Sequence, residues 1–416
     1  PEPEPEPEPD SGSSSSSGST STNVTANAEV SATITNTTAS ISISNSSLLR
    51  NVNAALKNSN DPKVKVFVKN TGSATTLKVT LPVSALTTLG KAGGSISIES
   101  GIATVTLDDT ILSAMANAKG TNVVLTVAPV PTDNLSAAQA AVVNGAPVYD
   151  LTLVCGSEKV NFNGGIATVE LPHILHANQS ADGVVVSYLT DDGTLDACTT
   201  SYNQSAGVVT FKTDHFSKYV VGYDPILVWD NTYVDVTSDD WFYDAVRYVG
   251  ANGMMSGIGS NQFAPAVTTN RAMVAQILYN LEGQPDISQE NQGYPYADVN
   301  GQAWYGDAVY WARLNGVATG YENNTFRPNQ AVTREELAQM LYNYAQYKGI
   351  ILLAMGDLSK FPDGDKVSSW AQTAMKWATG LGVINGYEDT TLRPGGSTTR
   401  AEAASMIMSL SSKLTK

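Results

Sequence analysis

The chain has 416 residues, a formal net charge of −15 and only 15% charged residues. Its length exceeds that of one ordinary domain, so two to four domains are expected. The acidic balance excludes a general nucleic-acid binder, because such a protein needs a basic surface that follows the phosphate backbone. Abundant Ser, Thr, Asn and Gly with few charges is typical of an exported protein.

The first 22 residues alternate Pro and Glu and then continue as a Ser- and Gly-rich run. Alternating Pro and Glu favours an extended, self-repelling segment, and the Ser/Gly run is flexible. We interpret residues 1–22 as a disordered spacer between an upstream module and the domains after it, with a plain disordered tail as the alternative. The start at Pro1 without a signal-type segment fits the C-terminal part of a longer protein or a trimmed chain.

Residues 23–224 are predicted to be rich in β-strands. We divide them into a β-rich module with one helix at 23–130, a partly helical joint at 131–145 and a β-sandwich-like module at 146–224. The helix is expected at 48–58, and Asp192-Gly193 predicts a hairpin turn. Alternating apolar and polar residues predict strands within 28–44, 63–70, 75–83, 148–156, 164–172, 183–197 and 207–221.

Residues 23–224 also contain a repeated seven-residue segment and both cysteines of the chain. Gly101–Leu107 reads GIATVTL and Gly165–Leu171 reads GIATVEL, which indicates two related β units. Cys155 and Cys198 are too few for a disulfide framework. They either form one bridge or remain two buried thiols, and the sequence leaves both open.

A threefold repeat begins at Tyr233, where the apolar period changes from two to that of a helix. Three tryptophans each precede an arginine by 30 residues, and Asp, Gly, Phe or Leu, and Pro keep the same frame. The matching positions are Asp235, Asp298 and Asp363; Trp241, Trp304 and Trp370; Gly257, Gly320 and Gly386; Phe263, Phe326 and Leu392; Pro265, Pro328 and Pro394; and Arg271, Arg334 and Arg400. This spacing predicts an all-α region in which one helix–loop–helix unit recurs at 233–283, 294–349 and 359–416.

The second helix of each unit is predicted to start at its arginine. Thr333 and Glu336 form a capping-box pattern, in which both side chains satisfy free amides of the helix start. Capping does not explain the arginine, because a cation at this end of the helix dipole is unfavourable by roughly 0.3–1 kcal/mol. Two explanations stay open: a site for an anionic group, or an ion pair with an acidic neighbour across the repeat interface, for which Asp298 and Asp363 are candidates.

The frame Asp … Trp … Gly-x-x-x-Gly-Tyr … Phe-x-Pro … Thr-Arg-x-Glu resembles the surface-layer homology (SLH) repeat of bacterial cell-surface proteins, over residues 233–416. The resemblance implies a pseudo-threefold arrangement whose grooves bind, non-covalently, the secondary polysaccharide attached to peptidoglycan. It also implies a sugar with ketal-linked pyruvate that the motif's arginine contacts. The implied glycan-binding residues are Arg271, Arg334, Arg400, Asp298, Asp363, Trp304, Trp370, Tyr321 and Tyr387.

The first repeat departs from this pattern. Asn270 replaces the capping Thr, Met273 the Glu, Ile258 the Tyr and Ala264 an Arg. Loss of a cation and an aromatic ring predicts a weaker groove at this repeat, and therefore unequal grooves.

Signals for catalysis are weak. His173 and His176 lack a helix that would align them on a metal ion, and no acidic or Cys cluster is near them in the sequence. His215 has no nucleophile partner, and no Gly-x-Ser-x-Gly elbow occurs. We expect no enzyme activity, no cofactor and no metal site.

We therefore expect a secreted protein of the cell wall or S-layer that anchors itself to peptidoglycan-linked secondary polysaccharide. Neither nucleic-acid binding nor membrane insertion is expected, because no stretch approaches the roughly 20 apolar residues of a membrane helix. An upstream module or neighbours in a surface array are further expected partners. The alternative is the C-terminal anchoring tail of a larger extracellular carbohydrate-active enzyme or adhesin.

Overall fold

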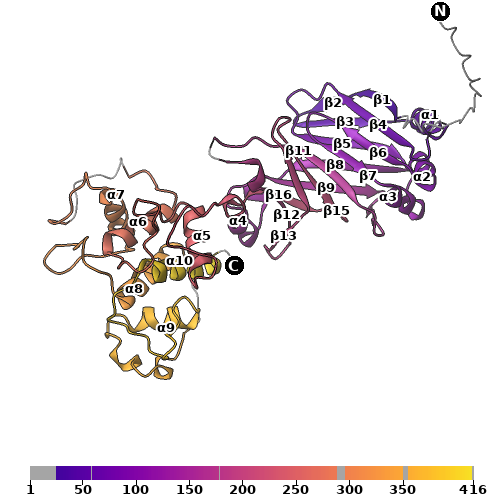
Figure 1. Ribbon diagram of the computed structural model, residues 1–416. Helices are drawn as coiled ribbons and strands as arrows, with labels where there is room; N and C mark the ends of the chain where they lie inside the picture. The colour runs from indigo at the N-terminus through magenta and orange to yellow at the C-terminus, as the bar shows by residue number, and fades with distance from the viewer. Residues whose placement is uncertain (1–24, 58, 178, 288–295, 350–354, 415–416) are drawn as a thin grey trace, which may run out of the picture. The chain divides into compact units, whose positions relative to one another are not determined.

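The computed structural model describes residues 25–57, 59–177, 179–287, 296–349 and 355–414 (Figure 1). The predicted spacer at residues 1–22 lies outside the described residues. The chain divides into two compact units. The described residues within 1–131, 147–174 and 198–220 form the β unit, and those within 132–146, 175–197 and 221–416 form the helical unit. Among the described residues, no helix is both long and apolar enough to cross a membrane.

The β unit contains two sheets in which apolar side chains alternate with polar ones, as half-buried strands require. In β4, for example, Val64, Val66 and Val68 are buried. The first sheet runs, edge to edge, through β1 (Thr25–Ser31), β4 (Lys63–Lys69), β6 (Ser95–Glu99), β7 (Thr104–Leu107), β11 (Ala167–Pro172), β15 (Val208–Thr213) and β14 (Thr200–Asn203). The β1–β4 and β4–β6 pairs are parallel and the other pairs are antiparallel.

The second sheet of this unit is also mixed. It runs through β2 (Thr33–Thr35), β3 (Thr38–Ser42), β5 (Thr76–Pro82), β8 (Asn122–Pro129), β9 (Val148–Cys155) and β16 (Lys218–Tyr223), and β10 (Glu158–Lys159) pairs with β9. Only the β3–β5 pair among these is parallel. Cys155 is a free thiol buried in β9, so the bridge that the sequence left open is not formed.

The structure differs from the predicted division of the β region. The β7–β11 and β8–β9 pairs join strands from both predicted modules, so residues 23–130 and 146–224 share their sheets. The first module also holds three α-helices instead of one: α1 (Asn45–Leu56), α2 (Val83–Lys91) and α3 (Asp109–Ala114). The helices α2 and α3 are short, and nine or fewer residues give too little periodicity to be distinguished from a strand end.

The two related sequence words lie next to each other in the first sheet. β7 and β11 are antiparallel neighbours, and Val105 pairs directly with Val169, the residue at the same place in the other word. Equivalent residues opposite each other define a local twofold relation between the two segments. This placement agrees with the interpretation of two related β units.

The helical unit begins with short elements and continues with six longer helices. α4 (Ala137–Val143) lies in the predicted joint, and β12 (Val184–Leu189) and β13 (Leu195–Ala197) form the predicted hairpin. The six helices are α5 (Tyr243–Ala251), α6 (Arg271–Leu281), α7 (Gly306–Leu314), α8 (Arg334–Tyr347), α9 (Gln372–Gly380) and α10 (Arg400–Leu414). Short 3₁₀ helices cover Met115–Asn117, Thr132–Asn134, Ala181–Gly183, Pro225–Val228, Leu358–Lys360 and Gly364–Lys366.

The predicted helix–loop–helix repeat is confirmed, with α6, α8 and α10 each starting at its arginine. Asn270 caps α6, and Thr333 with Glu336 forms a full capping box on α8. The β-rich N-terminal and helical C-terminal regions are therefore as predicted.

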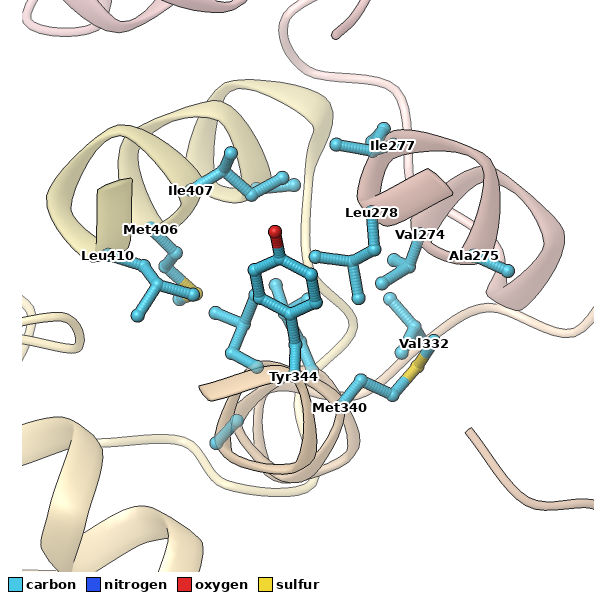
Figure 2. Packing of buried hydrophobic residues seen from close by; sticks show 14 of the residues in the cluster. Val274, Ala275, Ile277, Leu278, Val332, Met340, Tyr344, Met406, Ile407 and Leu410 are labelled. Atoms are coloured by element: carbon cyan, nitrogen blue, oxygen red, sulfur yellow. The ribbon is translucent and has the colours of Figure 1, made fainter. Parts of the chain in front are cut away.

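The core of the repeats combines these three second helices with the first helices and the loops of all three repeats. Figure 2 shows Tyr344 of α8 pointing between α6 and α10, with Leu278 on one side and Ile407 on the other. The Tyr344 hydroxyl donates a hydrogen bond of 2.8 Å to Glu282 at the end of α6, which gives this buried polar group a partner.

A closed ring of backbone hydrogen bonds joins the three repeats just before these helices. The amide of Val332 donates to the carbonyl of Thr269 at 3.0 Å, that of Thr398 to Val332 at 2.9 Å, and that of Thr269 to Thr398 at 2.8 Å. The three positions are equivalent in the repeat, so the ring gives the unit an approximate threefold axis. These short bridges also mean that the repeats are not purely helical.

Phe326 offers a test of the repeat core, because its side chain is fully buried and packs on the ring of Tyr296 with 5.5 Å between centroids. We expect Phe326→Ala to lower the free energy of unfolding by about 3–5 kcal/mol through a lost transfer term and a cavity. All six tryptophans lie between Trp229 and Trp377, so tryptophan fluorescence in urea reports this unit selectively. The control is Val267→Ala at an exposed position, and an equal effect of the two substitutions would contradict the prediction.

Candidate functional site

The three arginines hold neighbouring repeats together through main-chain carbonyls. Nε of Arg271 donates to the carbonyl of Phe326 at 2.9 Å, and Nη2 donates to that of Thr319 at 2.8 Å. Both acceptors belong to the next repeat. In the same way, Arg334 binds the carbonyls of Leu392 and Asn385, and Arg400 returns to those of Phe263 and Ser256 in the first repeat. We call these contacts the arginine clamps.

The clamps explain why each helix tolerates a cation at its positive end. Each guanidinium is buried, with 4–6% of the residue exposed, and makes two charge-assisted hydrogen bonds. Hydrogen bonds to a charged group contribute roughly 1.5–3 kcal/mol each, more than the dipole penalty of 0.3–1 kcal/mol. The interface role left open in the sequence is therefore present. Carbonyl oxygens are the partners of all three arginines, and Arg271 and Arg334 also form ion pairs with Glu336 and Glu402 of the next repeat.

Asp298 and Asp363 are not the ionic partners of the arginines, contrary to that alternative. Oδ1 and Oδ2 of Asp298 accept the amides of Phe326 and Arg327, both at 2.7 Å. Asp363 accepts those of Leu392 and Arg393, and Asp235 does the same in the first repeat. Each carboxylate thus fastens the loop of its own repeat, at a turn where Arg327 adopts a φ of 55°.

Burial acts against ionisation of Asp363, but two amide donors act more strongly. Burial raises the pKa of this carboxyl, and the hydrogen bonds from the Leu392 and Arg393 amides outweigh it, so the pKa lies below its usual value. The ionised carboxylate is therefore part of the folded loop.

The remaining edge of the Arg271 and Arg334 clamps faces a glutamate and a tyrosine of the next repeat. Nη1 of Arg271 lies 3.6 Å from Oε1 of Glu336, and the Tyr321 hydroxyl donates to that oxygen at 2.8 Å. The Tyr321 ring lies between two guanidinium groups, at 4.9 Å from Arg271 and 4.0 Å from Arg327.

The third repeat reproduces this arrangement. Arg334 lies 3.5 Å from Glu402, to which the Tyr387 hydroxyl donates a hydrogen bond. Arg334 and Arg393 lie 4.6 Å and 4.0 Å from the centre of the Tyr387 ring. Burial, followed by the hydrogen bond to Glu402, raises the pKa of Tyr387, so the phenol keeps its proton for this bond.

Two pockets open beside these clusters, and each is lined by residues from all three repeats. The repeat-3 groove, of about 640 Å³, is lined by Trp241, Arg334, Val383, Asn385, Gly386, Tyr387, Glu388, Asp389, Arg393, Glu402, Ser405 and Met406. The repeat-2 groove, of about 320 Å³, is lined by Arg271, Ala318, Thr319, Gly320, Tyr321, Glu336, Gln339, Met340, Asn343 and Trp370. The tryptophan of each groove is exposed, at 69% for Trp241 and 53% for Trp370.

The structure brings together most, but not all, of the residues predicted from the sequence. Arg271, Tyr321 and Trp370 line the repeat-2 groove, while Arg334 and Tyr387 line the repeat-3 groove. Arg400, Trp304, Asp298 and Asp363 line neither groove.

Sequence reasoning missed Trp241, which lines the repeat-3 groove although it belongs to the degenerate first repeat. Its place in the repeat frame was the available signal. Its membership in a groove of another repeat depends on the cyclic packing.

The first repeat gives its clamp different surroundings. Arg400 lies 4.6 Å from the ring of Phe263, but Met273 stands where the other clamps face a glutamate. Burial lowers the pKa of Arg400, while Tyr233 and Asp235 act in the opposite direction. Loss of the glutamate therefore removes the ionic part of this cluster.

The three histidines considered for catalysis, His173, His176 and His215, line neither groove. Nδ1 of His215 lies 2.8 Å from Oδ1 of Asp214, its neighbour in the chain, in the β unit. Among the described residues, no group of three or more His, Cys, Asp or Glu side chains is placed to hold a metal ion.

Comparison with known proteins identifies the repeats. Residues 232–272, 295–338 and 360–404 match the model of the S-layer homology domain. The C-terminal region of the chain thus consists of three S-layer homology repeats.

The chain is similar to parts of several longer proteins. It is 27% identical to the amylopullulanase of Thermoanaerobacterium thermosulfurigenes over 86% of this chain and 18% of that protein. It is 33% identical to the surface-layer 125 kDa protein of Lysinibacillus sphaericus over 39% of this chain and 13% of that protein. It is 29% identical to the cellulosome-anchoring protein of Acetivibrio thermocellus over 37% of this chain and 34% of that protein. The chain therefore spans about a third or less of these relatives.

Replacement of a clamp arginine tests its structural role. We expect Arg334→Lys to lower the free energy of unfolding by about 2–3 kcal/mol, because one ammonium group cannot reach both carbonyls with the geometry of a guanidinium. The measurement is urea unfolding followed by tryptophan fluorescence. Arg313→Lys, at an exposed position of the same unit, serves as the control. An unchanged midpoint in Arg334→Lys would remove the clamp as a source of stability.

The lowered pKa of Asp363 predicts that the stability of its loop decreases in acid. Its pKa is lowered in the folded state, so its contribution is complete above the unfolded value of about 3.9 and is lost as the pH falls through the folded value. We expect the stability difference between the wild type and Asp363→Asn to shrink as the pH falls from about 5 to below 3.9. Urea midpoints across this range measure it. A difference that stays constant with pH would contradict a charged role for Asp363.

Proposed function

We propose that the three S-layer homology repeats anchor this chain, without a covalent bond, to bacterial secondary cell wall polysaccharide that carries pyruvate. The observation that carries the proposal is that two grooves are lined by the same set of residue types. Each groove combines an exposed tryptophan, a clamp arginine and a tyrosine held by a glutamate, from three different repeats.

The chemistry of the grooves fits a sugar polymer. An exposed indole offers a flat apolar face with a polar edge, which suits the alternating apolar and hydroxylated surface of a sugar ring. Guanidinium groups supply donors for a carboxylate. Volumes of about 640 and 320 Å³ lie in the usual range of ligand pockets.

The residues that we assign to direct contact are Arg271, Tyr321 and Trp370 in one groove and Trp241, Arg334 and Tyr387 in the other. Arg400 and Trp304 occupy the equivalent positions at the first repeat, where we propose weaker binding. Asp298 and Asp363 support the groove loops through backbone amides and act indirectly.

The repeats place the chain at the extracellular cell surface, in agreement with the predicted localisation. Their part is that of a non-catalytic anchor. For the β unit we propose a role as a stalk or adhesion surface, and for the whole chain no enzyme activity, cofactor or metal.

A second candidate is the anchoring tail of a larger extracellular carbohydrate-active enzyme. The alignment with the amylopullulanase supports it, because that alignment covers 86% of this chain and so includes much of the β unit as well as the repeats. In both candidates the repeats perform the same anchoring.

Sedimentation with purified cell walls tests the anchor. We expect the chain to sediment with intact walls and to stay in solution with walls whose secondary polysaccharide has been removed by acid. We expect Trp241→Ala combined with Trp370→Ala to weaken wall binding roughly tenfold, since each aromatic contact contributes about 0.5–1.5 kcal/mol. Exposed tryptophans are preferable to clamp arginines here, because their loss leaves the repeat interfaces intact.

Trp304→Ala is the control for the weaker position at the first repeat. This tryptophan is 61% exposed and lines neither described groove, so a smaller loss of binding is expected. Equal binding to acid-treated walls would contradict recognition of the secondary polysaccharide. Equal loss of binding in the control and in the double variant would contradict the assignment to these two grooves.

A further inference from the structure

The repeat-2 and repeat-3 grooves share a loop geometry but differ in one charge. In repeat 3, Oδ1 of Asp389 accepts the Thr391 hydroxyl at 2.6 Å. In repeat 2, Oδ1 of Asn323 accepts the Thr325 hydroxyl at the same distance. The two loops therefore form the same local turn, one with a carboxylate and the other with a carboxamide.

The charge difference acts on an outer guanidinium beside each groove. Arg393 lines the repeat-3 groove, whereas Arg327 stacks on Tyr321, a lining residue of the repeat-2 groove, without lining that groove itself. Nη2 of Arg393 donates to Oδ2 of Asp389 at 2.8 Å in an ion pair. Hydrogen bonds from Thr391 and then Arg393 lower the pKa of Asp389 to about 2, so this partner is ionised at neutral pH. The outer cation of the repeat-3 groove is thus already neutralised.

The equivalent cation beside the repeat-2 groove lacks such a partner. Arg327 stacks on Tyr321 at 4.0 Å, the same distance at which Arg393 stacks on Tyr387. Its guanidinium reaches the amide oxygen of Gln330 at 3.5 Å, and no described carboxylate lies within ion-pair distance of it. Its positive charge is therefore available to a ligand.

The grooves also differ in volume. Gln339 lines the repeat-2 groove where Ser405 lines the repeat-3 groove, and the volumes are about 320 and 640 Å³. The inner cations do not distinguish the grooves, because Arg271 and Arg334 each face a glutamate at similar distance. Selectivity for charge must therefore come from the outer pair of positions.

We propose that the two grooves recognise different parts of the polymer. The smaller repeat-2 groove takes a sugar that bears a carboxylate, and Arg327, which stacks on Tyr321 beside that groove, is the specificity-determining cation. The larger repeat-3 groove takes an uncharged sugar segment, because Asp389 forms an ion pair with Arg393 and its carboxylate repels an anionic ligand. This division rests on the proposed function and assigns a ligand class to each groove.

The division follows from the rule that specificity needs a repulsive element as well as an attractive one. Asp389 is that element in the repeat-3 groove. Two grooves with complementary preferences can bind successive segments of one polysaccharide molecule. Once the first groove is occupied, binding at the second is intramolecular, so the overall affinity rises without added contacts in either groove.

Fluorine NMR of the full chain labelled with fluorotryptophan observes each groove separately. Trp370 reports the repeat-2 groove and Trp241 the repeat-3 groove, and Trp370→Phe and Trp241→Phe assign their signals. The probes are methyl glycosides of N-acetylglucosamine and N-acetylmannosamine, each with and without a pyruvate ketal. The exchange variants Asn323→Asp and Asp389→Asn swap the charge while keeping the Thr-accepting turn.

We expect the Trp370 signal to titrate at lower concentration with the ketal-bearing probe than with the bare one, and Asn323→Asp to reduce this preference about two- to fivefold. The Trp241 signal should not prefer the ketal in the wild type and should gain a two- to fivefold preference in Asp389→Asn. Equal ketal preference of both signals, or no response to the exchange, would overturn the division.

Wall sedimentation of the same samples separates this outcome from failure of the anchor. Retained wall binding with equal ketal preference in both grooves overturns only the division of labour. Retained wall binding with neither tryptophan signal responding overturns the division and the groove assignment together. Loss of wall binding in the wild type overturns the proposed function itself.

Discussion

The buried guanidinium at the start of each second helix is the contact on which the repeat region depends. Each one ties the helix start of one repeat to two carbonyls of the next, and the third returns to the first. A lone repeat would keep its arginine and its acceptor carbonyls, but each would lack the partner that a neighbouring repeat supplies. The helices, the loops and the ring through Thr269, Val332 and Thr398 therefore form one cooperative structure.

The grooves follow from the same contact. Because a clamp reaches into the neighbouring repeat, it meets the capping glutamate of that repeat, and the glutamate in turn holds a tyrosine. One carboxylate thus caps a helix, faces a cation and orients an aromatic ring. Recognition chemistry is concentrated at the seams between repeats, where the fold already gathers cations and rings. The loss of this glutamate at Met273 explains why the first repeat keeps its clamp but not the rest of the cluster.

The repeat region was largely readable from the sequence, because residue spacing and capping are local properties. The start of α8 at Arg334 and the cap at Thr333 follow from neighbouring residues alone. The partners of the arginines were not readable, since carbonyl oxygens leave no trace in residue identity. The role of Trp241 in a groove was not predicted for a related reason, because only the cyclic packing of the repeats brings it to the groove of the third repeat. In the β unit, strands were recognisable by alternation, whereas their pairing across residues 131–145 depends on contacts between distant segments.

The closed order of the three repeats also bears on how the region responds to force. The part of the chain that precedes the repeats, here called the tether, leads into the first repeat. Arg400 of the third repeat binds a loop carbonyl of the first repeat, and Arg271 of the first repeat binds a carbonyl of the second repeat. Pulling on the tether therefore loads two seams at once, and the first repeat cannot be peeled away until both yield. A linear array of three repeats would expose one seam at a time to the same load. Ring closure therefore divides a load on the first repeat between two seams, where a linear array would place it on one.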